Sequence, residues 1–317
     1  MKSIVIKKND EGQRLDKFLT KSFPNLPVSI IYKSIRKKRI KINNKRCEAS
    51  DKLVVGDILS LYINDEFLID DPDINFLSAC SDLEIIFEDE NILLINKPAG
   101  LLVHEDENQK VDTLINRIKK YLYDKKEYDI NLEMSFAPAL VHRLDRNTQG
   151  LVIAAKNSEA LRILNQKFKD REIKKYYLCL VHGVLKNKSG ILKNYLIKNE
   201  SENRVYVFQT PRQDSKIILT KYKVLKVIDN ISLLEIELLT GRTHQIRAHM
   251  AYINHPLVGD TKYGTAKINQ DYNLKHQALV SYKLTFDFKT DAGVLNYLKN
   301  RSFEIKDARN NIFNIIN

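Results

Sequence analysis

The chain has 317 residues, of which 43% are hydrophobic and 29% charged, values that speak against a disordered or membrane-embedded polypeptide and suit a soluble protein of two domains. Lys and Arg outnumber Asp and Glu by 52 to 40, so the net charge is +12 and a polyanionic partner is the first expectation. Three cysteines without a CxxC pair and an N-terminus without an apolar stretch predict a cytoplasmic, unexported protein without disulfides or bound zinc.

A basic segment lies near the N-terminus. Between residues 28 and 46 we expect a helix capped by Ser29, a strand over residues 39–42 and a turn at Asn43 and Asn44. A charge run is as often a solvated face as a binding surface, but the lack of counter-charges favours phosphate binding here. The basic residues of this segment are Lys33, Arg36, Lys37, Lys38, Arg39, Lys41, Lys45 and Arg46.

The composition predicts a boundary further along the chain. A strand is expected over residues 57–63, and residues 66–82, with the acidic run 70–73, are expected to be a linker. We therefore predict a small domain over residues 1–65 and a large one over residues 83–317. In the large domain, strands are expected at 83–87, 92–95, 151–155, 175–181 and 234–239, and a helix capped by Ser158. Antiparallel turns and scattered helices indicate an α+β fold.

Missing motifs narrow the chemistry. The chain has no GxxxxGK, GxGxxG, HExxH or GxSxG motif, so ATP, nicotinamide, zinc-hydrolase and serine-hydrolase chemistry lose their usual signatures. Three polar stretches remain within apolar surroundings, at residues 141–150, 174–183 and 240–264.

The residues of these stretches have structural readings as well as functional ones. Asp145 can pair with a neighbouring arginine or cap a turn. Tyr176 and Tyr177 lie on opposite faces of a strand, and a strand tyrosine is usually a packing residue. His244 and His249 are five residues apart and so do not share a helix face, which argues against a shared zinc ion. The pattern alone does not decide among these readings.

The three stretches together resemble the RluA-type family of pseudouridine synthases. The family motif HRLDxxTSG is similar to residues 142–150, and its KxYxAxVxG strand is similar to residues 175–183. The element TGRTHQxRxH matches residues 240–249, and residues 255–264 also fit the family pattern. Gln149 stands where the family usually has Ser, and Asn147 where an acidic residue is common. Both departures flank Asp145 without replacing it.

The resemblance implies a fold and a set of roles. It implies a mixed, mostly antiparallel sheet flanked by helices and loops, preceded by a small α/β domain that resembles the S4 RNA-binding module. Asp145 is the expected nucleophile or base, Arg247 its partner, and Tyr177 the residue that stacks on the target base. No cofactor and no metal are expected. The residues expected to contact RNA are Arg36, Lys37, Lys38, Arg39, Lys41, Lys45, Arg143, Arg242, Thr243, His244 and Gln245.

The implied substrate is an RNA uridine, which must be flipped out of its helix before it can react. Residues 27–32, which run into the basic segment, are most similar to family members that modify 23S rRNA of the large ribosomal subunit. The expected partner is this RNA or a large-subunit assembly intermediate, bound by a monomer. The alternatives are a synthase for tRNA or another rRNA site, or a non-catalytic ribosome-assembly factor.

Overall fold

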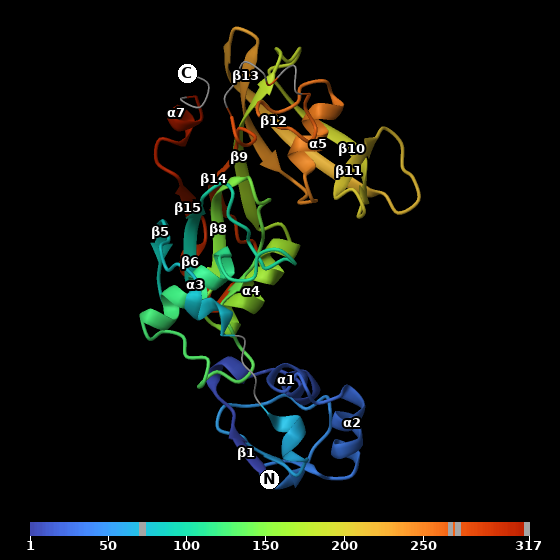
Figure 1. The fold of residues 1–317 in the computed structure, drawn as a ribbon, viewed down its shortest axis with the longest axis vertical. Helices are drawn as coiled ribbons and strands as arrows, with labels where there is room; N and C mark the ends of the chain where they lie inside the picture. Colours follow the sequence, from blue (N-terminus) through green and yellow to red (C-terminus); the bar gives the residue numbers. More distant parts are fainter. Residues whose placement is uncertain (70–73, 266–268, 270–273, 314–317) are drawn as a thin grey trace.

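The N-terminal domain is a small sheet with two helices. In the computed structural model, which describes residues 1–69, 74–265, 269 and 274–313, it forms the lower part of Figure 1. Its strands are β1 (Lys2–Val5), β2 (Ile40–Ile42), β3 (Lys45–Arg46) and β4 (Ile58–Leu61), in the spatial order β1-β4-β2-β3. Its helices are α1 (Leu15–Ser22) and α2 (Val28–Arg36), with 3-10 turns η1 (Lys8–Asp10) and η2 (Asp65–Leu68). Phe18, Leu19 and Ile31 belong to its apolar core.

Of two local predictions for this domain, the turn is confirmed and the helix cap is wrong. The turn predicted at Asn43 and Asn44 is confirmed: both have positive φ, 51° and 62°, which asparagine tolerates better than most residues. The cap predicted at Ser29 is wrong. Helix α2 begins at Val28 and its N-cap residue is Pro27, which makes no side-chain cap hydrogen bond. Proline has a fixed φ suited to the start of a helix, so it sets the boundary ahead of the serine.

The larger part of the molecule is built on one mixed sheet. Its strands follow the path β11-β10-β12-β13-β9-β14-β8-β6-β5, with β15 beside β14 and β7 beside β8. Strand β14 pairs with β8 in parallel, and the other ladders of the described residues are antiparallel. The strands are β5 (Ile85–Glu88), β6 (Ile92–Lys97), β7 (Ala139–Leu140), β8 (Gln149–Ala155), β9 (Ile173–His182), β10 (Ser189–Asn199), β11 (Arg204–Phe208), β12 (Lys216–Ile228), β13 (Ile231–Leu238), β14 (Leu279–Phe286) and β15 (Ser302–Glu304). The predicted α+β class with a mostly antiparallel sheet is confirmed.

Helices pack on this sheet through apolar faces. They are α3 (Leu114–Asp124), α4 (Ser158–Lys169), α5 (Gln245–Tyr252) and α7 (Ala308–Phe313), with 3-10 turns η3 (Asn75–Ser78) and η4 (Gly293–Leu298). Leu114, Ile118 and Leu122 of α3 recur at helical spacing and are buried. The cap predicted at Ser158 is off by one residue, because Asn157 is the N-cap and its side chain accepts from the backbone N–H of Ala160 at 2.8 Å. No helix among the described residues is long and apolar enough to cross a membrane.

The segment predicted as a linker is partly folded. Residues 70–73, which carry the acidic run, lie outside the described residues, whereas η3 is well formed. Phe76 of η3 is 1% exposed and packs in the same apolar cluster as α3 and β9. Part of the predicted linker therefore packs against the larger domain through Phe76, despite the acidic composition of the segment.

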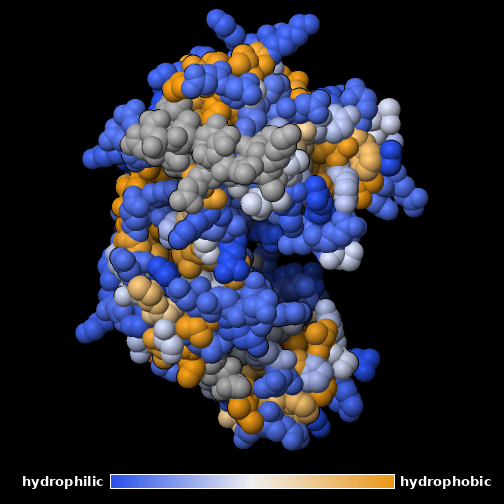
Figure 2. Space-filling model, turned by 45° about the horizontal axis from the view of Figure 1, so that its top comes forward, coloured by the Kyte–Doolittle hydropathy of each residue, from blue (hydrophilic) through white to orange (hydrophobic). Residues whose placement is uncertain are grey.

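Polar contacts join the two domains. The side chain of Asn9 donates to Glu133 at 3.1 Å and accepts from the backbone N–H of Ser158 at 3.1 Å. Ser135 donates to Asp10 at 2.5 Å, and Met134 packs against the N-terminal apolar core. Residues 133–135, which belong to the chain of the larger domain, thus form part of the N-terminal domain's surroundings. Figure 2 shows a hollow with mainly hydrophilic walls on one side of the molecule.

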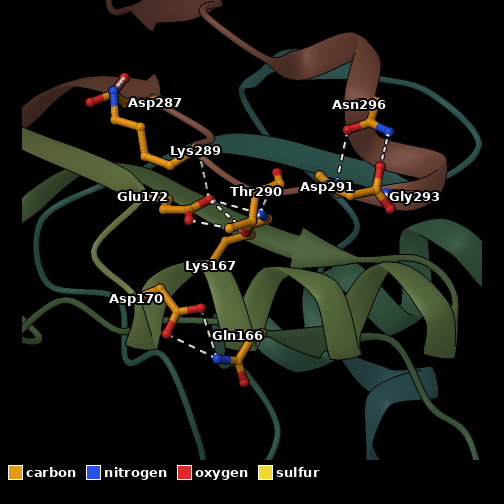
Figure 3. A network of polar contacts seen from close by, with 11 residues as sticks. Gln166, Lys167, Asp170, Glu172, Asp287, Lys289, Thr290, Asp291, Gly293 and Asn296 are labelled. Atoms are coloured by element: carbon orange, nitrogen blue, oxygen red, sulfur yellow. Dashed lines mark hydrogen bonds and ion pairs between the residues drawn. The ribbon is translucent and has the colours of Figure 1, made fainter.

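A charged cluster fixes the end of α4 to the C-terminal part of the chain (Figure 3). Lys167 donates from Nζ to the carboxylate of Glu172 at 2.7 Å and to the carbonyl and hydroxyl oxygens of Thr290 at 2.8 and 2.6 Å. Glu172 also accepts from the backbone N–H of Lys289 at 3.0 Å. Both charged side chains are almost completely buried, and each finds its partners within the cluster.

A close approach of two backbones sets the position of the polar loop 141–148. Gly150 lies where β8 meets β14 and has φ of +130°. A Cβ atom at this position would lie 2.3 Å from the carbonyl oxygen of Ser281, so only glycine lets the two strands meet. The loop before β8 is therefore held close to β14.

Candidate active site

The three polar stretches of the sequence meet around one cavity. The cavity has a volume of about 210 Å³ and is lined by the loop before β8, by the first half of β9 and by the segment between β13 and α5. Asp145, Tyr177 and Arg247 all line it, so the structure brings the three predicted catalytic residues together. The predicted RNA contacts Arg143, Arg242, Thr243, His244 and Gln245 line it too.

Asp145 sits in a loop with fixed ends. Its side chain is 26% exposed, while the neighbouring Leu144 is buried in the core. The carbonyl oxygen of Asp145 accepts from the backbone N–H of Thr148 at 3.0 Å, which closes a turn. The carboxylate is thus accessible from the cavity, while the backbone that carries it is held in place.

Lys97 secures the other side of this loop. Its side chain is completely buried, and Nζ donates to the carbonyl oxygens of Pro98 at 2.8 Å, Leu101 at 2.9 Å and Arg146 at 2.9 Å. Burial lowers the pKa of Lys97 to about 7, although the negative charge of Asp145 opposes this shift. Three acceptor carbonyls match the three hydrogens of an ammonium group. Lys97 therefore ties the residue after Asp145 to the 97–101 segment, a role that the sequence reasoning missed.

Arg247 directs its planar fork at Asp260. Its Nε and Nη2 donate to the two carboxylate oxygens of Asp260 at 2.7 and 3.0 Å, whereas Nη1 lies 3.5 Å from Oδ2 of Asp145. The expected pairing with Asp145 is present, but as the longer of two contacts. Burial alone would raise the pKa of Asp260, and the hydrogen bonds from Arg247 lower it instead. A buried arginine that reaches toward the cavity is thereby held by a second carboxylate.

Asp260 is a site residue that the sequence reasoning did not single out. It is completely buried and also accepts from the backbone N–H groups of Lys262 and Tyr263 at 2.9 and 3.0 Å. It lies in the stretch 255–264, which fits the family pattern but carried no assigned role. The signal that could have found it is the need of a buried arginine for a carboxylate partner.

His244 approaches Asp145 from the start of α5. Its Nε2 lies 3.9 Å from Oδ2 of Asp145, and its Nδ1 is 2.9 Å from the hydroxyl of Tyr263. Burial lowers the pKa of His244, and the charge of Asp145 works in the opposite direction. His244 has a positive φ of 51°, which turns the chain into α5 and brings the imidazole over the cavity.

The two tyrosines of β9 face opposite sides, as the strand pattern predicts. Tyr177 is 5% exposed, lines the cavity and belongs to the core cluster shared by α3 and β13. Tyr176 packs against a different apolar cluster, on the other face of the sheet. Burial raises the pKa of Tyr177, so its phenol stays protonated around neutral pH. Its ring is the aromatic surface of the cavity.

Two predicted or suspected polar residues serve the architecture of the site. The amide of Gln245 donates to the carbonyl oxygen of Leu219 and the hydroxyl of Thr220, both at 3.0 Å, and accepts from Thr240 and the N–H of Arg242. All its polar atoms are occupied, which leaves no free donor for the RNA contact expected of it. His249 is also buried, and burial lowers its pKa to about 4. Within the described residues no group of three or more His, Cys, Asp or Glu side chains is placed to hold a metal ion.

The basic residues of the segment 28–46 lie in the N-terminal domain, apart from the cavity, and we call them the basic surface: Lys33, Arg36, Lys37, Lys38, Arg39, Lys41, Lys45 and Arg46. Its side chains are exposed, apart from the partly buried Lys41, whose Nζ lies 5.6 Å from the ring centroid of Tyr62. Among the described residues none of these eight has a carboxylate within ion-pair distance. The surface therefore offers uncompensated positive charge to a partner.

Comparisons with known proteins agree with this geometry. A family model described as RNA pseudouridylate synthase matches residues 91–252, which include all three catalytic candidates and every residue that lines the cavity except Leu279. An S4 domain model matches residues 13–59, which include the whole basic surface. The chain belongs to the RNA pseudouridylate synthase family and is an RNA pseudouridine synthase, an isomerase, with an S4 RNA-binding domain.

Individual relatives are similar over most of the chain. An uncharacterized RNA pseudouridine synthase of Mycoplasma capricolum is 37% identical, covering 95% of this chain and 96% of its own. The ribosomal large subunit pseudouridine synthase C of Vibrio vulnificus is 34% identical, covering 84% of this chain and 80% of its own. The solved structure of human RNA Pseudouridylate Synthase Domain Containing 4 matches with a TM-score of 0.56 at 19% identity, over 74% of this chain and 92% of that one, and shows the shared fold.

Proposed function

We propose that this enzyme converts uridine to pseudouridine in large-subunit ribosomal RNA, with Asp145 as the nucleophile or base and without a cofactor. One observation carries the proposal. Asp145 is the single carboxylate among the described residues that line the cavity, and it lies between an arginine and a histidine. The reaction has no net redox change, so one well-placed carboxylate is enough to begin it.

The surroundings of Asp145 support this role. Arg247, held by Asp260, keeps a positive charge 3.5 Å from the carboxylate of Asp145. Tyr177 supplies an aromatic face next to it, on which a flipped-out uracil can stack. During the reaction the C1′–N1 bond breaks and a C1′–C5 bond forms, while C5 loses a proton and N1 gains one.

RNA is proposed to approach along exposed cationic groups. Arg143 and Arg242 are exposed and line the cavity, where they can meet the phosphates on either side of the flipped nucleotide. Thr243 and His244 contribute further donors there. The basic surface, including Arg36, Lys37, Lys38, Arg39, Lys41 and Lys45, is proposed to bind phosphates without regard to sequence. The proposed domains are residues 1–65 for this surface and 83–317 for catalysis, joined by 66–82.

The choice of large-subunit rRNA follows the relatives whose names contain it, such as the synthase C of Vibrio vulnificus at 34% identity. A tRNA or another rRNA site is the competing substrate within the same chemistry. An enzyme that acts on an extruded uridine selects its site through RNA structure around it. The alternative of a non-catalytic assembly factor is disfavoured by the complete set of Asp145, Tyr177 and Arg247 around one cavity.

The test is an assay of purified protein on separate transcripts of 23S rRNA, 16S rRNA and tRNA, with pseudouridines mapped in each. We expect product in 23S rRNA, and a loss of at least ~10³-fold in single-turnover rate for Asp145→Asn, with RNA binding retained. Asp214→Asn, at an exposed position that tolerates a positive φ, is the matched control and is expected to be fully active. Product formation by Asp145→Asn at the normal rate contradicts the assignment, and product confined to tRNA or 16S rRNA contradicts the substrate.

A further inference from the structure

Lys175 brings a second charged group into the cavity. It lies on β9 two residues before Tyr177, on the same face of the strand, and lines the cavity with it. Its neighbour Lys174 faces the other way, where its Nζ pairs with the carboxylate of Asp287 at 2.6 Å. Of two adjacent lysines on one strand, Lys174 is thus in an ion pair and Lys175 faces the cavity.

The ammonium group of Lys175 has no hydrogen-bond or ion-pair partner among the described residues. Within the described part of the chain, its Nζ makes no hydrogen bond and has no carboxylate within ion-pair distance. The Nζ lies 5.6 Å from the ring centroid of Phe168. A Cβ added to Gly241 would lie 3.2 Å from this Nζ, so the group also borders the segment leading to α5. Burial lowers the pKa of Lys175, and no nearby charge opposes that shift.

The other lysines of the interior differ from it in this respect. Lys167 has a carboxylate, a hydroxyl and a carbonyl oxygen, and Lys97 has three carbonyl oxygens. A partly buried ammonium group without acceptors from the protein is energetically unfavourable. A ligand that presents an oxygen acceptor to it would remove that penalty.

The chemistry of the reaction offers such an acceptor. When the C1′–N1 bond breaks, its electron pair remains on the uracil ring and is shared between N1 and the carbonyl oxygens O2 and O4. The ring then forms a bond from C5 to C1′, C5 releases its proton and N1 takes one up, so atoms and electrons balance. A cation beside a carbonyl oxygen stabilises the anionic stage more than it stabilises the neutral uridine.

We propose that Lys175 binds a carbonyl oxygen of the flipped-out uracil and stabilises the uracil anion while the glycosidic bond is broken. This deepens the proposed function and rests on it. Asp145 and Arg247 then act at the sugar end of the cavity, and Lys175 acts on the base stacked on Tyr177. The phosphates are left to Arg143 and Arg242, which are exposed, whereas Lys175 is partly buried in the sheet.

The experiment compares leaving groups. Lys175→Met removes the charge and keeps a similar apolar stem, and Lys174→Met, on the opposite strand face, is the matched control. Each protein is tested in single turnover on the rRNA transcript that the wild type modifies, made with uridine or with 5-fluorouridine. Breaking of the C1′–N1 bond is followed as loss of the intact nucleoside after digestion. Fluorine at C5 withdraws electrons and makes the departing anion more stable, so the fluorinated base depends less on a cation.

We expect Lys175→Met to slow cleavage of uridine by about 10- to 100-fold, and to slow cleavage of 5-fluorouridine by clearly less. RNA affinity and the rate of Lys174→Met should stay close to those of the wild type. An equal loss on both substrates, or no loss, overturns the inference and leaves the proposed function standing. A wild-type protein that modifies no transcript overturns the proposed function and this inference with it.

Discussion

The charged cluster at the end of α4 and the cavity around Asp145 both contain buried or partly buried charges, but the charges differ in how completely they are paired. In the cluster, burial alone would raise the pKa of Glu172, yet the hydrogen bonds from Lys167, Lys289 and Thr290 lower it to about 2. In the cavity, Asp145 is partly exposed and shares Arg247 with Asp260, and Lys175 has no acceptor among the described residues. Charges with complete sets of partners hold the fold together, whereas incompletely matched charges are available to a substrate.

Asp260 tests this distinction most severely, because it belongs to both categories. It neutralises a buried arginine, and it holds that arginine beside Asp145. We expect Asp260→Asn to lower the single-turnover rate by about 100-fold, since Arg247 would no longer be held in place. The free energy of unfolding should fall by roughly 3 kcal/mol, because a buried charge loses its partner. Quenched-flow assays and urea denaturation measure the two effects.

Asp214→Asn serves again as the control for these measurements. An Asp260→Asn variant that is less stable but fully active per folded molecule would place Asp260 with the structural charges. A variant with normal stability would contradict the pairing itself.

Lys167 offers the converse case, in which stability changes without catalysis. We expect Lys167→Met to lower the free energy of unfolding by about 3 kcal/mol, because Glu172 is left charged and buried. The rate per folded molecule should be unchanged. Adding Glu172→Gln should recover part of the loss, since the remaining charge is then removed. Chemical denaturation of the two single variants and the double variant measures the coupling.

Lys169→Met, at an exposed position near the end of the same helix, is the control for loss of a lysine. If the double variant is as unstable as the sum of the two single variants, Lys167 and Glu172 do not act as a pair.

The basic surface is a third case, because its charges have no ion-pair partners but remain exposed to water. They cost the fold little, so their neutralisation should affect RNA binding alone. Replacing Arg36, Lys37, Lys38 and Arg39 by Gln should reduce the slope of log affinity against log salt by about 3, with the saturated rate unchanged. Filter binding at several salt concentrations measures it. An unaltered slope would make the surface a solvated face, and neutralising the exposed Lys126, Lys169, Lys299 and Lys306 is the control.

The sequence predicts those parts of the site whose chemistry is concentrated in short motifs. Asp145, Tyr177 and Arg247 were predicted because each lies in a recognisable stretch, and all three line the cavity. Strand alternation correctly separated Tyr177 from Tyr176. Asp260 and Lys97 were missed, because their roles depend on contacts with residues 13 and 49 positions away. Contacts between residues so far apart in the chain cannot be predicted from local sequence.

The predicted starts of two helices were wrong for a local reason. At Ser29 and Ser158 a serine looked like a cap, but Pro27 and Asn157 came first and set the helix start. A serine near the start of a helix cannot be distinguished from the N-cap residue until the backbone angles are known. Burial of Phe76 in a segment of acidic composition was hidden in the same way, because a single aromatic side chain does not change an average.

The contacts between Asn9, Asp10 and residues 133–135 make the N-terminal domain more than an appendage. Anyone who cuts the chain near residue 65 to obtain a minimal enzyme also strips Glu133 of its amide donor and uncovers Met134. A chimera that exchanges this domain between relatives should therefore carry residues 132–135 from the same parent, although these residues lie some seventy positions further along the chain.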